Sequence, residues 1–173
     1  MELLSNILLA VLPAMVVFFT SFYLIKTFIK SEQKKQYYEF KTETAKTTIP
    51  LRLQAYERIA LYLERIAPGN LVMRIYKPGM SARLMQSELL KTIRSEYDHN
   101  VAQQVYLSSA GWQVVKKAKE ETIRIVNIAI TRVGDDANGN ELGQAIIEIA
   151  AQLEKSPSDF AMEYLKIEIK NIF

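Results

Sequence analysis

The densest cluster of reactive side chains in the sequence is Tyr97-Asp98-His99-Asn100, which contains the only histidine of the chain. An aspartate beside a histidine suggests general acid or base catalysis. Adjacent residues point in different directions on a helix, however, so Asp98 and His99 need not meet. No nucleophile elbow or glycine-rich phosphate loop accompanies them. We therefore interpret the cluster as a helix end, with Asp98 or Asn100 capping the next helix. A hydrolase or transferase that uses Asp98 and His99 is the last-ranked alternative, and we expect that the chain is not an enzyme.

The loop Gly134–Asn140 has the sequence GDDANGN and resembles part of a calcium-binding EF-hand. Aligned by its internal glycine, it supplies Asp136 and Asn138 at the third and fifth ligand positions. The first and twelfth positions, which must carry carboxylates, are then Gly134 and Ala145. The loop is therefore predicted to be an exposed turn without a metal.

Composition excludes several kinds of cofactor site. The chain has no cysteine and one histidine, so disulfides, thiolate metal sites, iron–sulfur clusters and multi-histidine metal sites are excluded. We expect no cofactor. Four large side chains would suit a ligand pocket between helices, but residues of this kind at helical spacing are more typical of a core: Met85, Tyr97, Tyr106 and Trp112.

Positive charge is concentrated in one half of the chain. Residues 26–94 hold 14 Lys and Arg against 6 Glu, whereas residues 95–173 hold 8 Lys and Arg against 12 acidic residues. Arginines near chain breaks are suited to a phosphate-bearing ligand, and the candidate contacts are Arg52, Arg74, Lys77 and Arg83. A solvated face and ion pairs within the fold explain the same arginines. We do not expect a nucleic-acid partner, because such sites are usually more basic.

The element that decides the location of the chain is Ile7–Ile25, nineteen residues without a charged side chain. A helix of this length spans about 30 Å, the thickness of a bilayer core. Four cations follow it at once, Lys26, Lys30, Lys34 and Lys35, which favours an N-out, C-in single pass through the inner membrane. A signal peptide is the alternative, but the residues before Ile7 carry no basic side chain.

Residues 1–25 are thus predicted to be a transmembrane anchor, in which Pro13 kinks the helix and favours a partner in the membrane. Residues 26–48 form a basic, polar stalk. It either stands free and pairs with a second copy, or lies at the membrane surface with Tyr37 and Tyr38 at the interface.

The predicted fold class is all-α: the anchor and stalk are followed by a helical cytoplasmic domain, residues 49–173, with a bundle of about five helices. Hydrophobic periodicity and turn signals place these elements. The predicted helices and turn are Pro50–Ala67, a turn at Pro68-Gly69-Asn70, Ser81–Asp98, Asn100–Val133, Glu141–Glu154 and a last helix from Ser156. The last helix has a predicted apolar stripe of Phe160, Tyr164, Ile167 and Phe173.

Two stretches, Thr47–Arg74 and Ser87–Glu121, resemble an uncharacterised family of small single-pass membrane proteins found in Bacteroidota bacteria. The resemblance implies an all-helical cytoplasmic domain and brings no activity or catalytic residue.

We expect a membrane-anchored, non-enzymatic interaction or scaffold protein, as an accessory subunit of an inner-membrane assembly or as a homo-oligomer. The alternative is a module that binds anionic lipid head groups or another phosphate-bearing ligand through the basic residues of 26–94.

Overall fold

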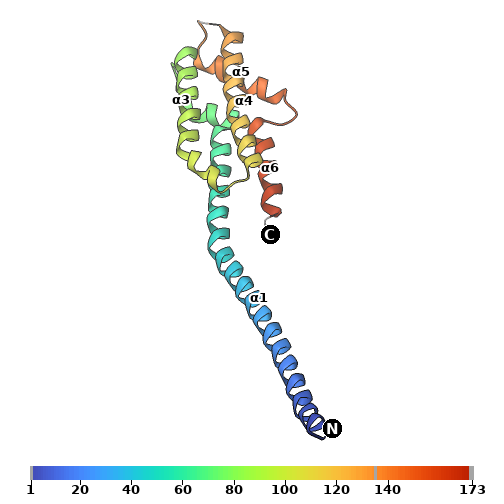
Figure 1. Ribbon diagram of the computed structural model, residues 1–173. Helices are drawn as coiled ribbons and strands as arrows, with labels where there is room; N and C mark the ends of the chain where they lie inside the picture. Colours follow the sequence, from blue (N-terminus) through green and yellow to red (C-terminus); the bar gives the residue numbers. More distant parts are fainter. Residues whose placement is uncertain (1, 135, 172–173) are drawn as a thin grey trace. The chain divides into compact units, whose positions relative to one another are not determined.

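The fold is all-α, as the sequence predicts. A computed structural model describes residues 2–134 and 136–171, and Asp135 and Phe173 of the predicted loop and stripe lie outside these residues. The described residues form six α-helices and one 3-10 helix (Figure 1): α1 (Glu2–Ile66), α2 (Pro68–Ile75), α3 (Ala82–Asn100), η1 (Val101–Val105), α4 (Ser109–Val133), α5 (Gly139–Ala151) and α6 (Pro157–Lys170).

The chain divides by its internal contacts into two compact units. The N-terminal unit ends at Ile49, and the helical unit comprises Pro50–Phe173. Within the N-terminal unit, every side chain from Val11 to Thr44 is exposed. Among the described residues, one helix is long and apolar enough to cross a membrane, over Val11–Ile66, with a mean hydropathy of 1.7 in its most apolar window. A signal sequence near an N-terminus meets the same criterion.

The core of the helical unit is built around α4, which packs against α3, α5 and α6. Its buried side chains recur at helical spacing, as at Val115, Ala118, Thr122 and Ile125. The Thr122 hydroxyl donates to the Ala118 carbonyl at 2.9 Å, so this buried polar group is satisfied. The last part of α1 contributes another buried row: Ala55, Tyr56, Ile59, Tyr62, Leu63 and Ile66. Each fully buried aliphatic side chain stabilises the fold by about 1.5–3 kcal/mol.

Helix starts are set by side-chain caps, and Ser81 and Ser156, where the sequence predicts that helices begin, are such caps. The hydroxyl of Ser81 accepts from the backbone N–H of Leu84 at 3.3 Å, and that of Ser156 accepts from Asp159 at 3.2 Å. Gly134, with φ of 86°, ends α4 as predicted, because a left-handed residue after a helix favours glycine.

The predicted helix start at Pro50 and the predicted turn at Pro68 are wrong. Helix α1 runs through Pro50, because one lost hydrogen bond is outweighed by the many that a long helix makes on both sides. Pro68 is the first residue of α2, a position where the missing N–H costs nothing. The Asn70 side chain donates to the Glu64 carbonyl at 3.0 Å and so pairs a free acceptor at the end of α1.

The single helix predicted over Asn100–Val133 is also wrong. The structure inserts η1 and a short loop, and α4 begins only after Ser108, whose hydroxyl accepts from the Gly111 N–H at 2.9 Å. Ser108 therefore caps α4, and Gly111 lies in its first turn. The stretch from Thr122 to Val133 is helical and buries one face, whereas the opposite face is exposed: Arg124, Asn127, Ile128, Thr131 and Arg132.

The last two helices differ from the prediction in start and orientation. Helix α5 begins at Gly139, two residues early, because Asn138 and Glu141 form a capping box. Asn138 also pairs with Ser81 in an isolated antiparallel bridge, so the loop is tied to α3 and its Ala137 is buried. In α6 the predicted apolar stripe faces outward, since Ala161 and Leu165 are the buried apolar residues.

Candidate functional site: two grooves of the helical unit

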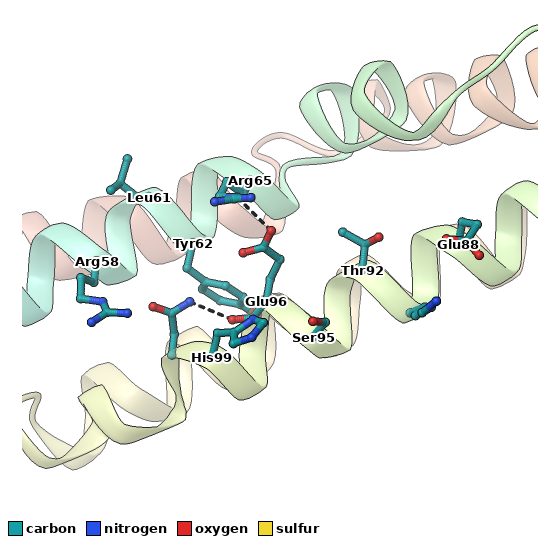
Figure 2. Close-up of a pocket in the computed structure, with 11 residues that line it drawn as sticks. Arg58, Leu61, Tyr62, Arg65, Glu88, Thr92, Ser95, Glu96 and His99 are labelled. Carbon is teal, nitrogen blue, oxygen red and sulfur yellow. Dashed lines mark hydrogen bonds and ion pairs between the residues drawn. The ribbon is translucent and has the colours of Figure 1, made fainter.

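A polar groove of about 610 Å³ lies between the end of α1 and the second half of α3 (Figure 2). We call it the α1–α3 groove. The two helices run antiparallel across it, so that Arg58 and His99 lie toward one end and Glu88 at the other (Figure 2). Its walls are Arg58, Leu61, Tyr62, Arg65, Glu88, Lys91, Thr92, Ser95, Glu96, His99 and Asn100.

At the centre of this groove, Glu96 forms ion pairs with two arginines. Its Oε1 atom accepts from Arg65 Nε at 2.9 Å and lies 3.4 Å from Arg74 Nη1. Arg74 also donates through Nη2 to the Arg65 carbonyl at 3.3 Å. Only 15% of the Glu96 side chain is exposed, so solvent screens these interactions less than it screens a surface pair. One carboxylate thus faces two guanidinium groups, and a net positive charge remains.

The cluster at the end of α3 does not form an acid–base pair. In the part of the chain that the structure describes, no hydrogen bond or ion pair joins Asp98 to His99. The predicted capping by Asp98 or Asn100 is wrong, because the Asn100 side chain donates back to the Glu96 carbonyl at 2.8 Å. His99 instead lines the α1–α3 groove.

Tyr62 lines the groove and belongs to an aromatic cluster that extends into the core. Tyr62 meets Tyr97 edge to face with centroids 6.3 Å apart, and Tyr97 packs on Trp112 at 5.5 Å. The ammonium of Lys119 lies 4.2 Å from the centre of the Tyr97 ring, a cation–π contact. Burial raises the pKa of Tyr62 well above its usual value, and its buried hydroxyl has no hydrogen-bond partner among the described residues. The predicted core placement of Trp112 and Met85 is confirmed, whereas Tyr106 is partly exposed.

A second polar cluster joins three elements through the carboxylate of Glu168 on α6. Its Oε1 accepts from the Tyr56 hydroxyl of α1 and from the Ser108 N–H at 3.0 Å, and its Oε2 accepts from the Ser108 hydroxyl at 2.8 Å. Burial acts to raise the pKa of Glu168, but the bonds from Tyr56 and Ser108 outweigh it and hold that pKa below its usual value. Burial and the same bond raise the pKa of Tyr56 to about 12. The Glu168 carboxylate, the Tyr56 hydroxyl and the Ser108 hydroxyl all have hydrogen-bond partners, which indicates that this cluster stabilises the fold.

An apolar groove of about 520 Å³ lies between α4 and the segment that joins α5 to α6. We call it the α4–α6 groove. Its apolar walls include Val114, Ala118, Leu153, Pro157 and Phe160, with 45% of Leu153 and 53% of Phe160 exposed. Charges of both signs border it: Lys117, Glu121, Glu154, Lys155 and Glu163.

One border pair of the α4–α6 groove is already formed. The Lys155 ammonium donates to Glu163 at 2.6 Å, and this hydrogen bond raises the pKa of Lys155. The two residues link the loop before α6 to the helix itself, beside the exposed Phe160. The groove thus combines an apolar floor with a polar border.

The residues predicted at the membrane all lie on α1 within the N-terminal unit. Pro13, Lys26, Lys30, Lys34, Lys35, Tyr37 and Tyr38 are exposed. The Lys26 ammonium lies 6.0 Å from the centre of the Phe22 ring, and Lys35 lies 4.0 Å from Glu39, one helical turn on. The stalk residues 26–48 are helical.

The four cations predicted to contact an anion have separate surroundings. Arg52 donates to the Tyr106 carbonyl at 3.1 Å, near Glu168. Arg74 joins Arg65 and Glu96, whereas Lys77 is exposed between α2 and α3 and Arg83 is exposed in the first turn of α3.

Sequence reasoning did not single out the cations that do share a groove. Arg58 and Arg65 are seven residues apart on α1, so they lie on one side of the helix. Lys91, Ser95 and His99 follow one another at spacings of four on α3. These spacings are visible in the sequence, but the pairing of the two faces depends on the fold.

The profile of one protein family, described as a family of unknown function, matches residues 2–172. The chain belongs to this family, DUF7935. The match spans both units, so the apolar helix and the helical unit occur together in DUF7935. No curated protein and no solved structure matches this DUF7935 member. Among its described residues, no group of three or more His, Asp or Glu side chains is placed to hold a metal ion.

Proposed function

We propose that the chain is a single-pass membrane protein that holds its helical unit at the cytoplasmic face of a bacterial inner membrane, where it binds another protein as an accessory or scaffold subunit. The long apolar helix supports the membrane location. The lysines at 26, 30, 34 and 35 support an N-out, C-in orientation, because positive charge is retained on the cytoplasmic side.

The α4–α6 groove is the observation that carries the binding role. A contiguous apolar surface that is bordered by polar residues is typical of a protein interaction site. Leu153 and Phe160 provide aliphatic and aromatic surface, and the mixed charges at the border give a partner several ways to pair. The partner that fits is a protein segment with an apolar side chain as its anchor and charged residues around it.

The test is purification of the tagged full-length protein from its native membranes in mild detergent, with mass spectrometry of the proteins in fixed stoichiometry. Phe160→Glu places a charge in the α4–α6 groove and should remove the partner. Met73→Glu is the control, because 72% of Met73 is exposed on α2, outside both grooves.

Loss of the same partner from both variants, or from neither, contradicts the proposed groove. Recovery of the wild-type protein as a monomer contradicts the subunit role itself. Recovery as a homo-oligomer that Phe160→Glu disrupts identifies the partner as a second copy.

A further inference from the structure

The α1–α3 groove brings cationic side chains from two helices to face one space. Arg58 and Arg65 extend from α1, and His99 lies across from them on α3 (Figure 2). Lys91 lines the groove farther along α3. These residues belong to helices that the buried core holds in place, so the backbone positions that carry the cations are fixed before any ligand arrives.

Much of this positive charge is not neutralised by ion pairs within the fold. Arg65 and Arg74 share the single carboxylate of Glu96. Arg65 makes this contact through Nε, and 57% of its side chain is exposed. Arg58 and Lys91 form no ion pair within residues 2–134 and 136–171. Exposed arginines usually contribute to solubility alone, but here two of them share one wall with hydroxyl groups opposite.

We propose that the α1–α3 groove binds the phosphate group of a ligand, held by Arg58 and Arg65 on one side and by Ser95 and His99 on the other. A guanidinium presents parallel N–H donors that match the oxygens of a phosphate. A hydroxyl and an imidazole add hydrogen bonds from the opposite helix.

The carboxylates of the groove fit this assignment. Glu96 is neutralised by its two arginines. Glu88 lies eleven residues before His99, which is about 16 Å along a helix, so it stays away from the phosphate end. The volume of about 610 Å³ exceeds what a phosphate alone fills, and the rest of the ligand extends toward Thr92 and Lys91. A phosphate of this kind is carried by a lipid head group or by a soluble phosphomonoester.

Calorimetric titration of the full-length protein in uncharged detergent micelles tests the proposal and separates the two sources. The probes are inorganic phosphate, glycerol 3-phosphate, short-chain phosphatidic acid and phosphatidylcholine with the same chains. Binding of glycerol 3-phosphate as tight as that of phosphatidic acid assigns a soluble ligand, whereas binding of phosphatidic acid alone assigns a lipid. In either case the affinity should fall as salt is added.

Arg58→Gln should weaken the binding of the probe about tenfold or more, because a charge-assisted hydrogen bond is lost. Arg132→Gln is the matched control: Arg132 is an exposed arginine in the last turn of α4 and lines neither groove, so its replacement should change affinity less than about twofold. Both residues are exposed, so both variants should fold, which circular dichroism checks. Failure of every probe to bind, or equal weakening by the two substitutions, overturns the proposal.

Discussion

Glu168 shows how a single carboxylate can hold distant segments of the helical unit together. Its oxygens pair with Tyr56, 112 residues earlier in the chain, and with both the N–H and the hydroxyl of Ser108. Tyr56→Phe should lower the free energy of unfolding by about 1–3 kcal/mol, because it removes a charge-assisted bond from a part-buried carboxylate. Urea denaturation measures this. Tyr164→Phe, on the exposed side of α6, should leave the midpoint unchanged, and an equal loss in both variants would show that the bond contributes nothing.

The pKa values of the same pair predict how stability depends on pH. The pKa of Glu168 is lower in the folded state, so its contribution is present above the ordinary value of 4.5 and is lost as pH falls through the lowered value. The pKa of Tyr56 is raised from 10.0 to about 12, so its contribution is lost as pH rises between these values. Thermal melts of Glu168→Gln across the acidic range should show a smaller loss than those of the wild type. If stability falls equally with pH in the wild type and in Glu168→Gln, the lowered pKa of Glu168 is not the cause.

Gly111 lies directly against the carboxylate of Glu168. A Cβ at this position would overlap with Glu168 Oε2 and lie 3.2 Å from its Cδ. Gly111→Ala should therefore destabilise the protein by about 1–3 kcal/mol, despite the better helix propensity of alanine. Gly69→Ala is the control, because nothing lies within 4 Å of its Cβ and a gain of about 0.4–1 kcal/mol is expected. Chemical denaturation of both variants decides whether crowding at Glu168 is the cause.

At the scale of elements, the capping box of α5 joins the loop after α4 to the bundle. The Asn138 side chain accepts from the N–H groups of Asn140 and Glu141 at 2.9 and 3.1 Å, and Glu141 accepts from the Asn138 N–H at 3.1 Å. Asn138→Ala should cost about 1 kcal/mol of stability. Asn140→Ala, one position into the helix, should be nearly neutral. Faster amide hydrogen exchange confined to the first turn of α5 would confirm the origin of the loss.

The helices could be predicted where a local signal exists. Which face of each helix is buried could not always be predicted. Ser81, Gly134 and Ser156 mark helix ends by their own chemistry, which the structure confirms. In α6, hydrophobicity favoured Phe160 and Ile167 as inward residues, yet Ala161 and Leu165 are the apolar residues that are buried where α6 packs against α4. Ser108 was missed as a cap because the run from Asn100 was predicted as one helix, although the capping partner of Ser108, the Gly111 N–H, is only three residues away. The α1–α3 groove was missed because its two faces are separate in sequence and meet only through packing.

At the scale of the whole molecule, the proposed anchor predicts behaviour that the helical unit alone would not show. The full-length protein should stay with membranes after an alkaline carbonate wash, whereas deletion of residues 2–25 should release it, because the helix loses its longest apolar stretch. Replacing the lysines at 26, 30, 34 and 35 with glutamate should weaken or invert the orientation. Fractionation and a protease-accessibility assay measure both effects. A mature N-terminus after residue 25 would instead establish cleavage of a signal sequence.

The bond between Tyr56 and Glu168 also has a consequence in time, because a ribosome makes the chain in one direction. Tyr56 and the start of α4 are synthesised well before α6. The donors at Tyr56 and Ser108 therefore lack the Glu168 carboxylate until α6 has been synthesised. Contacts so distant in sequence form late. The nascent helices α1 to α5 therefore pass through a stage in which the apolar surface that later covers Ala161 and Leu165 is open. We expect this interval, rather than the finished fold, to be when the protein depends most on chaperones.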